Sequence, residues 1–354
     1  MGRLTGPARR RRRAQGVRRT RALLGAAAAT AVAGSACAGA STSSSGEGDA
    51  DARANAGRSA ERAPPPRLAR GAPPSAGPLL VRAVDPRAPT ADGALYEISA
   101  DGVRRAGRPK CARVHASPGG PALCVRVSAN GYDYEAVVLD GAYRPRARLP
   151  VDGVPSRVRV SRDGRYGALT TFEGRGQGYF ADTSDFSTAT RIVDMRSGRP
   201  LLRLEDLLLR RDGRWAPASG GDLWGVTFGE RGRFYATYAT GPDHLLIEGR
   251  VGSRRARVVG RHVECPSLSP DGTRIAYKRR IGATDSWRLH VRELANGRDW
   301  ALAETRSIDD QPEWLGDGWI AYSHAGAVYA ARADGSGSPA LLAASAASPA
   351  ALAR

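Results

Sequence analysis

The sequence has few of the residues that build metal centres and covalent active sites. Its 354 residues include four cysteines and five histidines, and no two of these have the spacing of a metal-ligand pair. We therefore expect no metal ion and no cofactor. The sequence also lacks a Gly-x-Ser-x-Gly motif, and no helical hydrolase domain follows its strand-like part. Both absences argue against a serine peptidase.

Lysine is almost absent. Lys110 and Lys278 stand against 52 arginines, and the formal net charge is +19. Residues 1–37 carry nine of the arginines and no acidic residue, so their removal would leave +10. We interpret the arginine bias as compositional rather than as a nucleic-acid footprint, and no nucleic-acid partner is expected.

A long apolar run is missing as well. The nine arginines of residues 1–21 precede an uncharged, alanine-dominated run at 22–36. This layout is typical of an export signal, and the run is shorter than the roughly 20 residues of a membrane-spanning helix. Arg18 and Arg19, before Thr20, resemble a twin-arginine signal. We predict a signal peptide at 1–37 and an extracytoplasmic protein, secreted or anchored to the outer face of the cell membrane.

The end of this signal leaves two alternatives open. Cleavage at Ala36-Cys37-Ala38 would release the protein, whereas cleavage directly before Cys37 would allow lipidation of its thiol, as in bacterial lipoproteins. A lipidated Cys37 would tether the protein to the membrane. Residues 38–78 are rich in Ser, Gly, Ala and Pro and are predicted to form a disordered low-complexity linker.

The remaining chain repeats one turn motif. The clearest copy is Ser269-Pro270-Asp271-Gly272, which precedes the strand-like Ile275-Ala276-Tyr277. Weaker copies begin at residues 117, 161, 229 and 316, so the steps are 44, 68, 40 and 47 residues. A period of about 40 residues is typical of propeller blades with four short strands. The long step requires an insertion, which we place at 173–188.

These repeats predict an all-β, six-bladed β-propeller at 79–354, whose 276 residues give 46 per blade. Gly93-Ala94-Leu95-Tyr96 recurs near the end of the chain as Gly326-Ala327-Val328-Tyr329, which indicates that strands from both ends close one ring. A β-sandwich of unrelated hairpins is the alternative. Residues 204–210 are predicted to form one helical turn, and the alanine-rich residues 340–353 are expected to be helical or frayed.

Acidic residues precede the innermost strand of three predicted blades. They are Asp222, Glu264 and the run Asp309-Asp310-Gln311. Because such loops converge around one mouth of the central channel, these side chains form a candidate site for a cation, a basic peptide or a sugar. The alternative is that the carboxylates cap backbone N–H groups of neighbouring loops.

The cysteines suggest one disulfide. Cys111 and Cys124 flank the first turn at similar distances, so we expect them opposite, or nearly opposite, each other on adjacent antiparallel strands. In an oxidising compartment such a pair is a plausible disulfide. Cys265 has no partner and is predicted to be a buried, inert thiol on an inner strand.

The stretches 264–277 and 309–322 resemble the propeller repeat of the TolB family, a WD-repeat-like group. The likeness extends over about 79–354 and is strongest in the last two blades. It implies a six-bladed propeller outside the cytoplasm that acts by binding, as in exported TolB-like proteins of high-GC Gram-positive bacteria. TolB itself has a folded α/β domain before its propeller, and a linker occupies that position here. A Tol-Pal role is therefore not carried over.

We thus expect a monomeric, non-catalytic binding module that presents one face to an envelope protein or an anionic envelope polymer. The alternative is a propeller enzyme of the lyase, lactonase or glycosidase type that uses acids at the channel mouth. Such chemistry would need a histidine partner for the acids. His262, two residues from Glu264, is the nearest one in the sequence.

Overall fold

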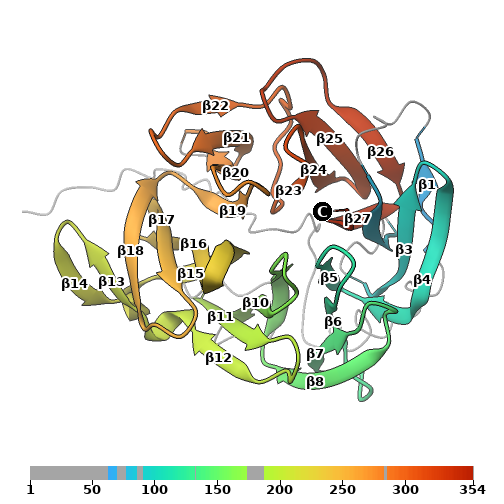
Figure 1. Cartoon of the computed structure of the whole chain (residues 1–354), viewed down its shortest axis with the longest axis horizontal. Helices are drawn as coiled ribbons and strands as arrows, with labels where there is room; N and C mark the ends of the chain where they lie inside the picture. The colour runs from blue at the N-terminus through green and yellow to red at the C-terminus, as the bar shows by residue number, and fades with distance from the viewer. Residues whose placement is uncertain are drawn as a thin grey trace, which may run out of the picture. The chain divides into compact units, whose positions relative to one another are not determined.

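Strands make up nearly all of the regular structure and are arranged around a central axis (Figure 1). The computed structural model describes residues 63–69, 77–85, 91–131, 133–173, 187–282 and 285–353. The described strands form six sheets, and no α-helix occurs among these residues. The predicted six-bladed β-propeller is therefore confirmed. The predicted signal peptide, with Cys37, lies outside the described residues.

The first three blades have four strands each. From the channel outward, blade 1 consists of β27 (Ala346–Ala351), β2 (Leu79–Ala83), β3 (Gly93–Ser99) and β4 (Gly102–Cys111). Blade 2 consists of β5 (Arg113–Ala116), β6 (Ala122–Val127), β7 (Tyr134–Leu139) and β8 (Pro145–Val151). Blade 3 consists of β9 (Val154–Val160), β10 (Tyr166–Glu173), β11 (Ser187–Asp194) and β12 (Pro200–Arg203).

The other three blades differ in width. Blade 4 consists of β15 (Asp222–Phe228), β16 (Arg233–Thr240), β17 (Asp243–Arg250), β18 (Arg255–Arg261), β13 (Leu208–Arg211) and β14 (Arg214–Pro217). Blade 5 consists of β19 (Glu264–Leu268), β20 (Arg274–Arg280), β21 (Trp287–Glu293) and β22 (Asp299–Ala301). Blade 6 consists of β23 (Glu313–Leu315), β24 (Trp319–His324), β25 (Ala327–Arg332), β26 (Ala340–Ala344) and β1 (Arg67–Leu68).

The repeated turn motif joins the innermost strand of a blade to the second strand. Between β19 and β20, the N–H of Gly272 donates to the carbonyl of Ser269 at 2.9 Å, and Asp271 accepts the N–H of Thr273 at 3.0 Å. Gly272 has a φ of +73°, a conformation that a Cβ disfavours. Asp163 and Gly164 repeat these contacts between β9 and β10. Local side-chain chemistry therefore sets the start of the second strand in both blades.

The first and last strands of the described residues complete blades 6 and 1. The C-terminal β27 pairs with β2 as the innermost strand of blade 1, and β1 pairs with the outer strand β26 of blade 6. The expectation of a helical or frayed end at 340–353 is wrong, because these residues form β26 and β27. Small side chains such as Ala343, Ala346 and Ala350 are buried between blades, so packing overrides the helical preference of alanine. Within the predicted linker, Arg67 and Leu68 form a strand.

The extra length of the 68-residue step between the turns of blades 3 and 4 has two parts. One lies between β10 and β11 of blade 3, as predicted, although its residues 174–186 are outside the described residues. The other is the hairpin β13–β14, which the sequence analysis did not predict and which adds to the outer edge of blade 4 through a parallel pairing of β13 with β18. The predicted turn at 204–210 is a 3-10 turn at Leu204–Asp206 that continues into β13.

The core consists of apolar layers between neighbouring blades. Six buried clusters are present, one at each blade junction. At the junction of blades 3 and 4, for example, Ile192 packs with Phe234 and Ile247, all fully buried. Because each cluster joins two blades, the ring must close before its core is complete.

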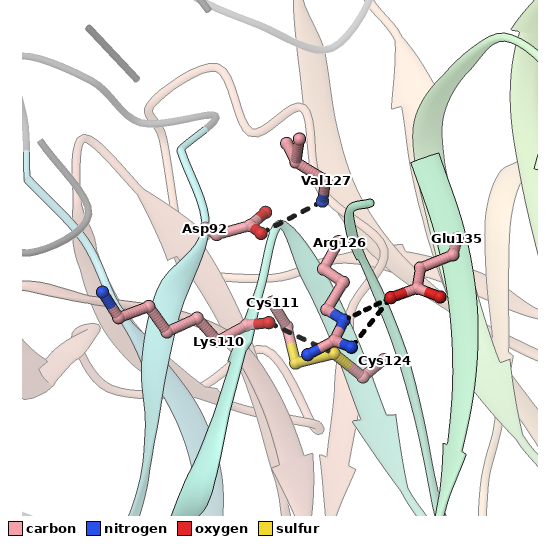
Figure 2. Close-up of a disulfide and its surroundings, with 7 residues drawn as sticks. All are labelled: Asp92, Lys110, Cys111, Cys124, Arg126, Val127 and Glu135. Atoms are coloured by element: carbon pink, nitrogen blue, oxygen red, sulfur yellow. Dashed lines mark hydrogen bonds and ion pairs between the residues drawn. A yellow bond between two sulfur atoms is a disulfide. The ribbon is translucent and has the colours of Figure 1, made fainter. Parts of the chain in front are cut away.

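A disulfide links the first two blades. Cys111 at the end of β4 is bonded to Cys124 on β6, with the Cα atoms 5.5 Å apart (Figure 2). The expected placement on adjacent strands was wrong, because Val114 is the residue opposite Cys124 in the β5–β6 register. Cys111 instead belongs to the neighbouring sheet. The bond therefore connects two blades rather than two strands of one hairpin.

Candidate functional site at the channel mouth

A cavity of about 180 Å³ lies at one mouth of the central channel, between blades 1, 2, 3 and 6. Its walls come from the starts of innermost strands and the ends of second strands, which share one end of the ring because these strands are antiparallel. The charged wall residues are four arginines and two aspartates: Arg82, Arg113, Arg157, Arg159, Asp309 and Asp310. The mouth is therefore predominantly cationic.

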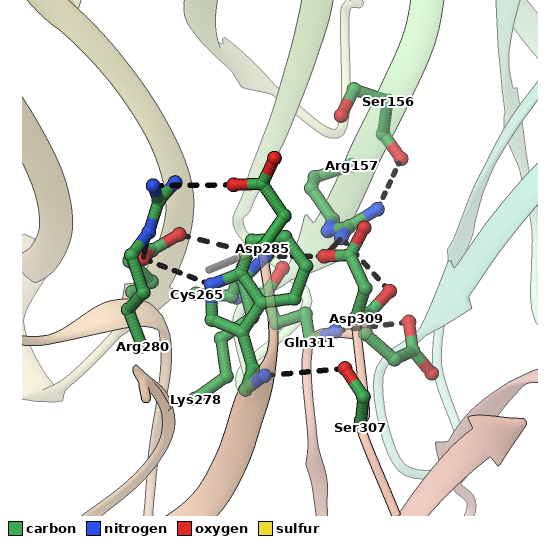
Figure 3. A network of polar contacts seen from close by, with 12 residues as sticks. Ser156, Arg157, Cys265, Lys278, Arg280, Asp285, Ser307, Asp309 and Gln311 are labelled. Carbon is green, nitrogen blue, oxygen red and sulfur yellow. Dashed lines mark hydrogen bonds and ion pairs between the residues drawn. The ribbon is translucent and has the colours of Figure 1, made fainter. Parts of the chain in front are cut away.

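Two ion pairs cross the channel from blade 3 to blade 6, which face each other in a ring of six. Arg157 on β9 has its Nη2 3.4 Å from Oδ1 of Asp309 (Figure 3). Arg159, two residues further along β9, pairs with Glu313 on β23 and also donates from Nη2 to the carbonyl of Pro312 at 2.8 Å. Arg157, Arg159 and Glu313 are all buried. These pairs hold opposite blades together beneath the mouth.

His115 on β5 joins this buried cluster. Its Nδ1 accepts the N–H of Val160 at 3.1 Å, and its Nε2 is 3.2 Å from Oε2 of Glu313. Burial lowers the pKa of His115 in spite of the nearby Glu313 carboxylate, so the ring is neutral at pH 7. Burial would raise the pKa of Glu313, but the charge of Arg159 and the contact with His115 hold it at about 2. Glu313 is therefore ionised, and both His115 nitrogens are engaged.

Arg82 and Arg113 form the second cationic part of the cavity. Arg113 donates from Nε to the carbonyl of Ser156 at 2.9 Å and from Nη1 to that of Ala112 at 3.0 Å. Arg82 is 3% exposed and donates from Nη1 to the carbonyl of Ala91 at 3.0 Å. Burial and the neighbouring charge of Arg113 lower the pKa of Arg82 to about 9. The charge of Arg113 thus raises the cost of the charge on Arg82, and the carboxylates of Asp92 and Asp310 partly offset this cost.

Two of the acids predicted from the sequence meet at a buried lysine. Lys278 on β20 is 2% exposed and pairs with Asp309, while its Nζ lies 3.6 Å from Oε2 of Glu264. Glu264 also accepts the indole N–H of Trp287 at 3.0 Å. Figure 3 shows the Lys278 and Asp309 side chains in this network. The two carboxylates are thus compensated by protein groups.

The other three predicted residues bond to backbone groups of neighbouring segments. Asp222 accepts the N–H of Thr188 at 2.9 Å, and Asp310 accepts that of Ser323 at 2.7 Å. Gln311 donates to the carbonyls of Val226 at 3.0 Å and Pro266 at 2.8 Å. The contacts of Asp222 and Asp310 are the capping contacts of the alternative interpretation, whereas Gln311 donates to carbonyl groups. Of the five predicted residues, Asp309, Asp310 and Gln311 line the cavity, whereas Asp222 and Glu264 do not.

Sequence reasoning missed the arginines, which dominate the site. One local signal was present, because Arg157 and Arg159 alternate on an innermost strand where apolar residues are usual. The sequence indicated His262 as the histidine nearest to Glu264 along the chain, whereas in the structure His244 contacts Glu264, with Nδ1 3.2 Å from Oε1. Neither His244 nor Glu264 lines the cavity. Within the described residues, no three His, Cys, Asp or Glu side chains are grouped as a metal site would require.

Fold and site together define a class of protein: a six-bladed β-propeller with a charged cavity at one channel mouth. TolB from Acinetobacter baumannii is structurally similar, with a TM-score of 0.53 and 15% identity over 78% of this chain and 67% of that one. A TolB candidate from Agrobacterium tumefaciens has a TM-score of 0.46 and 12% identity over 75% of this chain and 87% of its own.

A propeller in a nidogen/laminin complex gives a TM-score of 0.49 and 12% identity over 72% of this chain and 89% of that one. No family model and no curated protein matches the sequence. At identities this low, the similarity shows a shared fold and no more. The protein thus has a TolB-like propeller fold, and what it binds must be argued from its own residues.

Proposed function

We propose that this protein is a non-catalytic, exported TolB-like propeller that acts as a binding module at the cell envelope. In this proposal, an envelope protein or polymer places an anionic group, a carboxylate or a phosphate, in the cavity at the channel mouth. The observation that carries the proposal is the wall of the cavity, which has four arginines against two aspartates.

The distribution of partners within the cavity supports an anionic ligand. Arg157 and Arg159 are paired with Asp309 and Glu313, and Asp310 is bonded to backbone amides. Arg82 and Arg113 bond to carbonyl groups, and the charge of Arg113 lowers the pKa of Arg82 while the carboxylates of Asp92 and Asp310 act to raise it. An anion between them would relieve this repulsion and accept the short, charge-assisted bonds that guanidinium groups form with carboxylate or phosphate.

This ligand class differs from those that the sequence suggested for the channel mouth. Acids alone would have favoured a cation, a basic peptide or a sugar, but Lys278 and Arg157 already compensate Asp309. A basic ligand would have to approach the arginines of the wall, which costs energy in a partly desolvated site. The proposed ligand is therefore acidic.

A binding role is favoured over catalysis by the state of the histidines. General acid–base chemistry needs a side chain that can exchange a proton with a bound substrate. His115 has contacts at both ring nitrogens, and the His244–Glu264 pair lies outside the walls of the cavity. His324 also lines the cavity, with its ring centre 6.4 Å from that of Tyr329, and it is the histidine on which an enzymatic alternative would depend. Turnover of an envelope-derived substrate that is lost in His324→Gln but kept in His262→Gln would favour that alternative, a propeller enzyme.

Export is supported by sequence and by one structural feature. The signal-like residues 1–37 lie outside the described chain, but the Cys111–Cys124 disulfide suits an oxidising compartment. None of the helical segments described is long and apolar enough to cross a membrane. The sequence motif at Cys37 is the basis for proposing that membrane attachment depends on lipidation of its thiol. Fractionation of cells that carry Cys37→Ser tests this, because unchanged membrane association would exclude the lipid tether.

Affinity capture from solubilised cell envelope tests the binding role. The full chain serves as bait, together with Arg113→Gln and the matched control Arg148→Gln, whose side chain is 56% exposed on β8. We expect one discrete partner to be retained by the wild type and the control and to be lost in Arg113→Gln. Equal retention by all three baits would contradict a channel-mouth site.

A further inference from the structure

Blade 4 carries an uncovered face at its outer edge. Its sheet has six strands, whereas the neighbouring blade 5 has four and ends in the three-residue strand β22. Near the channel, Tyr235 and Leu246 of blade 4 pack against Ile275 and Tyr277 of blade 5. Further out, blade 5 has no strand to cover β18, β13 and β14, which extend away from the ring in Figure 1.

The strand register places a group of arginines on this face. Arg255 and Arg257 alternate along β18, and the parallel pairing of β13 with β18 sets Arg210 opposite Arg257. Arg210 in turn lies opposite Trp215 on β14. Arg233 and Arg250 are cross-strand partners on the same face. We call this surface the blade 4 shelf; its members are Arg210, Trp215, Arg233, Arg250, Arg255 and Arg257.

The shelf is exposed and has a large excess of positive charge. All five of its arginines are exposed, and Trp215 is 47% exposed with the Arg255 guanidinium 5.3 Å from its ring centre. Among the residues that line the adjoining hollow of about 410 Å³, Glu248 is the single acid. Arg257 holds it by bonds of 2.8 and 2.6 Å, and Arg233 lies 3.5 Å away. One carboxylate thus stands among five guanidinium groups.

We infer that the blade 4 shelf binds a linear polyanion that carries phosphate groups. Alternate residues on a strand lie about 7 Å apart and adjacent strands about 4.8 Å apart, so the arginines form a grid that can contact successive charges of one chain. Guanidinium groups suit phosphate, and the Trp215 ring offers an apolar contact for the atoms between phosphates. A flexible chain can enter the hollow, which a flat lipid surface cannot follow.

This inference is independent of the channel-mouth proposal, because the two sites share no residue. The test measures binding of a linear polyphosphate to the full chain, with inorganic phosphate and phosphatidylglycerol vesicles as separate arms. The test variant is Arg255→Gln/Arg257→Gln. The control is Arg196→Gln/Arg199→Gln, which removes the same charge from two exposed positions in the turn of blade 3 between β11 and β12.

We expect the shelf variant to lose polyphosphate affinity by roughly tenfold and to reduce the slope of log affinity against log salt by roughly 1.5, while the control changes little. Trp215→Ala, which leaves the charge unchanged, should also weaken binding. The nine arginines of residues 1–37 add the same background of polyphosphate binding to the wild type and to all variants. Hydrogen exchange therefore supplies a local readout: polyphosphate should slow exchange in β13, β14 and β18.

Three results would overturn the inference. One is an equal loss of polyphosphate affinity in the shelf variant and the control, which would mean that net charge alone binds the polymer. Another is protection confined to other segments of the chain. The third is binding to vesicles that depends on the shelf, in the absence of binding to polyphosphate, because it would assign the surface to a membrane.

Discussion

Arg159 of blade 3 and Glu313 of blade 6 form a buried ion pair across the central channel, although 154 residues separate them in the sequence. Nε of Arg159 is buried and finds no hydrogen-bond partner among the described residues, so its charge depends on contacts made by the other two nitrogens. The pair thus links opposite sides of the ring at the floor of the proposed site.

Glu313→Gln should lower the free energy of unfolding by about 3 kcal/mol, because it leaves a buried guanidinium without its counter-charge. Denaturant titration measures this. The matched control is Glu135→Gln, whose carboxylate pairs with the partly exposed Arg126 and the exposed Arg148; the expected loss is under about 1 kcal/mol. Equal losses of unfolding free energy in the two variants would show that the pair across the channel stabilises the fold no more than a surface ion pair.

The same pair predicts a loss of stability in acid. The pKa of Glu313 is about 2 in the folded protein, against 4.5 as its ordinary value. A folded pKa below the unfolded one stabilises the protein above pH 4.5, and this contribution is lost as the pH falls from 4.5 toward 2. Glu313→Gln should therefore have a shallower dependence of stability on pH in this range. A slope identical to that of the wild type would contradict the assignment.

The raised pKa of Asp92 predicts that folding stability falls, rather than rises, as the pH increases toward neutrality. Its carboxylate accepts the N–H of Val127 at 3.0 Å (Figure 2), and burial raises its pKa to about 7. A folded pKa above the ordinary 3.8 means that the folded state holds the extra proton, so this group makes stability fall as the pH rises from about 4 to 7. Asp92→Asn should flatten that slope and be more stable than the wild type above pH 7. Asp152→Asn, at an exposed acid, is the control and should retain the slope.

Gly225 tests the close packing of blades 4 and 5. A Cβ at this position would lie 2.6 Å from Cα of Cys265, and its φ is +65°. Gly272 has a similar φ of +73° but open space around it. Gly272→Ala should therefore show the backbone strain alone, about 1 kcal/mol, and Gly225→Ala a further 1–3 kcal/mol or so from overpacking. Thermal or denaturant unfolding of the two variants gives the difference, and equal effects would refute the close approach.

The disulfide between blades 1 and 2 closes a short loop, so its removal should cost about 3 kcal/mol. Cys111→Ala/Cys124→Ala and the reduced wild type should unfold at the same denaturant concentration, below that of the oxidised wild type. Reductant should leave the double variant unchanged. If reductant exposes the two thiols of the wild type to titration but leaves its denaturant midpoint unchanged, the disulfide does not stabilise the fold.

The fold was largely predictable because its signals are local. Asp271 and Gly272 define a turn within a few residues, and the spacing of such turns together with the length of the repeat region gives the blade count. The hairpin β13–β14 was missed although its turn carries a local signal: Asp212 and Gly213 both have positive φ, as in the two-residue hairpin turns that Asp-Gly favours. The strands of the alanine-rich end were missed because tertiary packing between blades, rather than intrinsic preference, decides their structure.

The site was less predictable because its residues come from distant parts of the chain. Of the residues that the sequence indicated, Asp309, Asp310 and Gln311 line the cavity. It did not reveal that Lys278 and Arg157 would compensate Asp309, nor that Arg82 and Arg113 would face the same space. Those relationships exist only once blades 1, 2, 3 and 6 are closed around one axis.

The most direct test of the channel-mouth proposal is a calorimetric titration of the full chain with inorganic phosphate and, separately, with acetate. The background carries Arg255→Gln/Arg257→Gln, so that the blade 4 shelf does not contribute. The account predicts saturable binding of at least one of these anions, weakened by roughly tenfold on adding Arg113→Gln and unchanged on adding Arg148→Gln, since one charge-assisted contact is lost. Absence of saturable binding, or equal affinities in all three proteins, would contradict it.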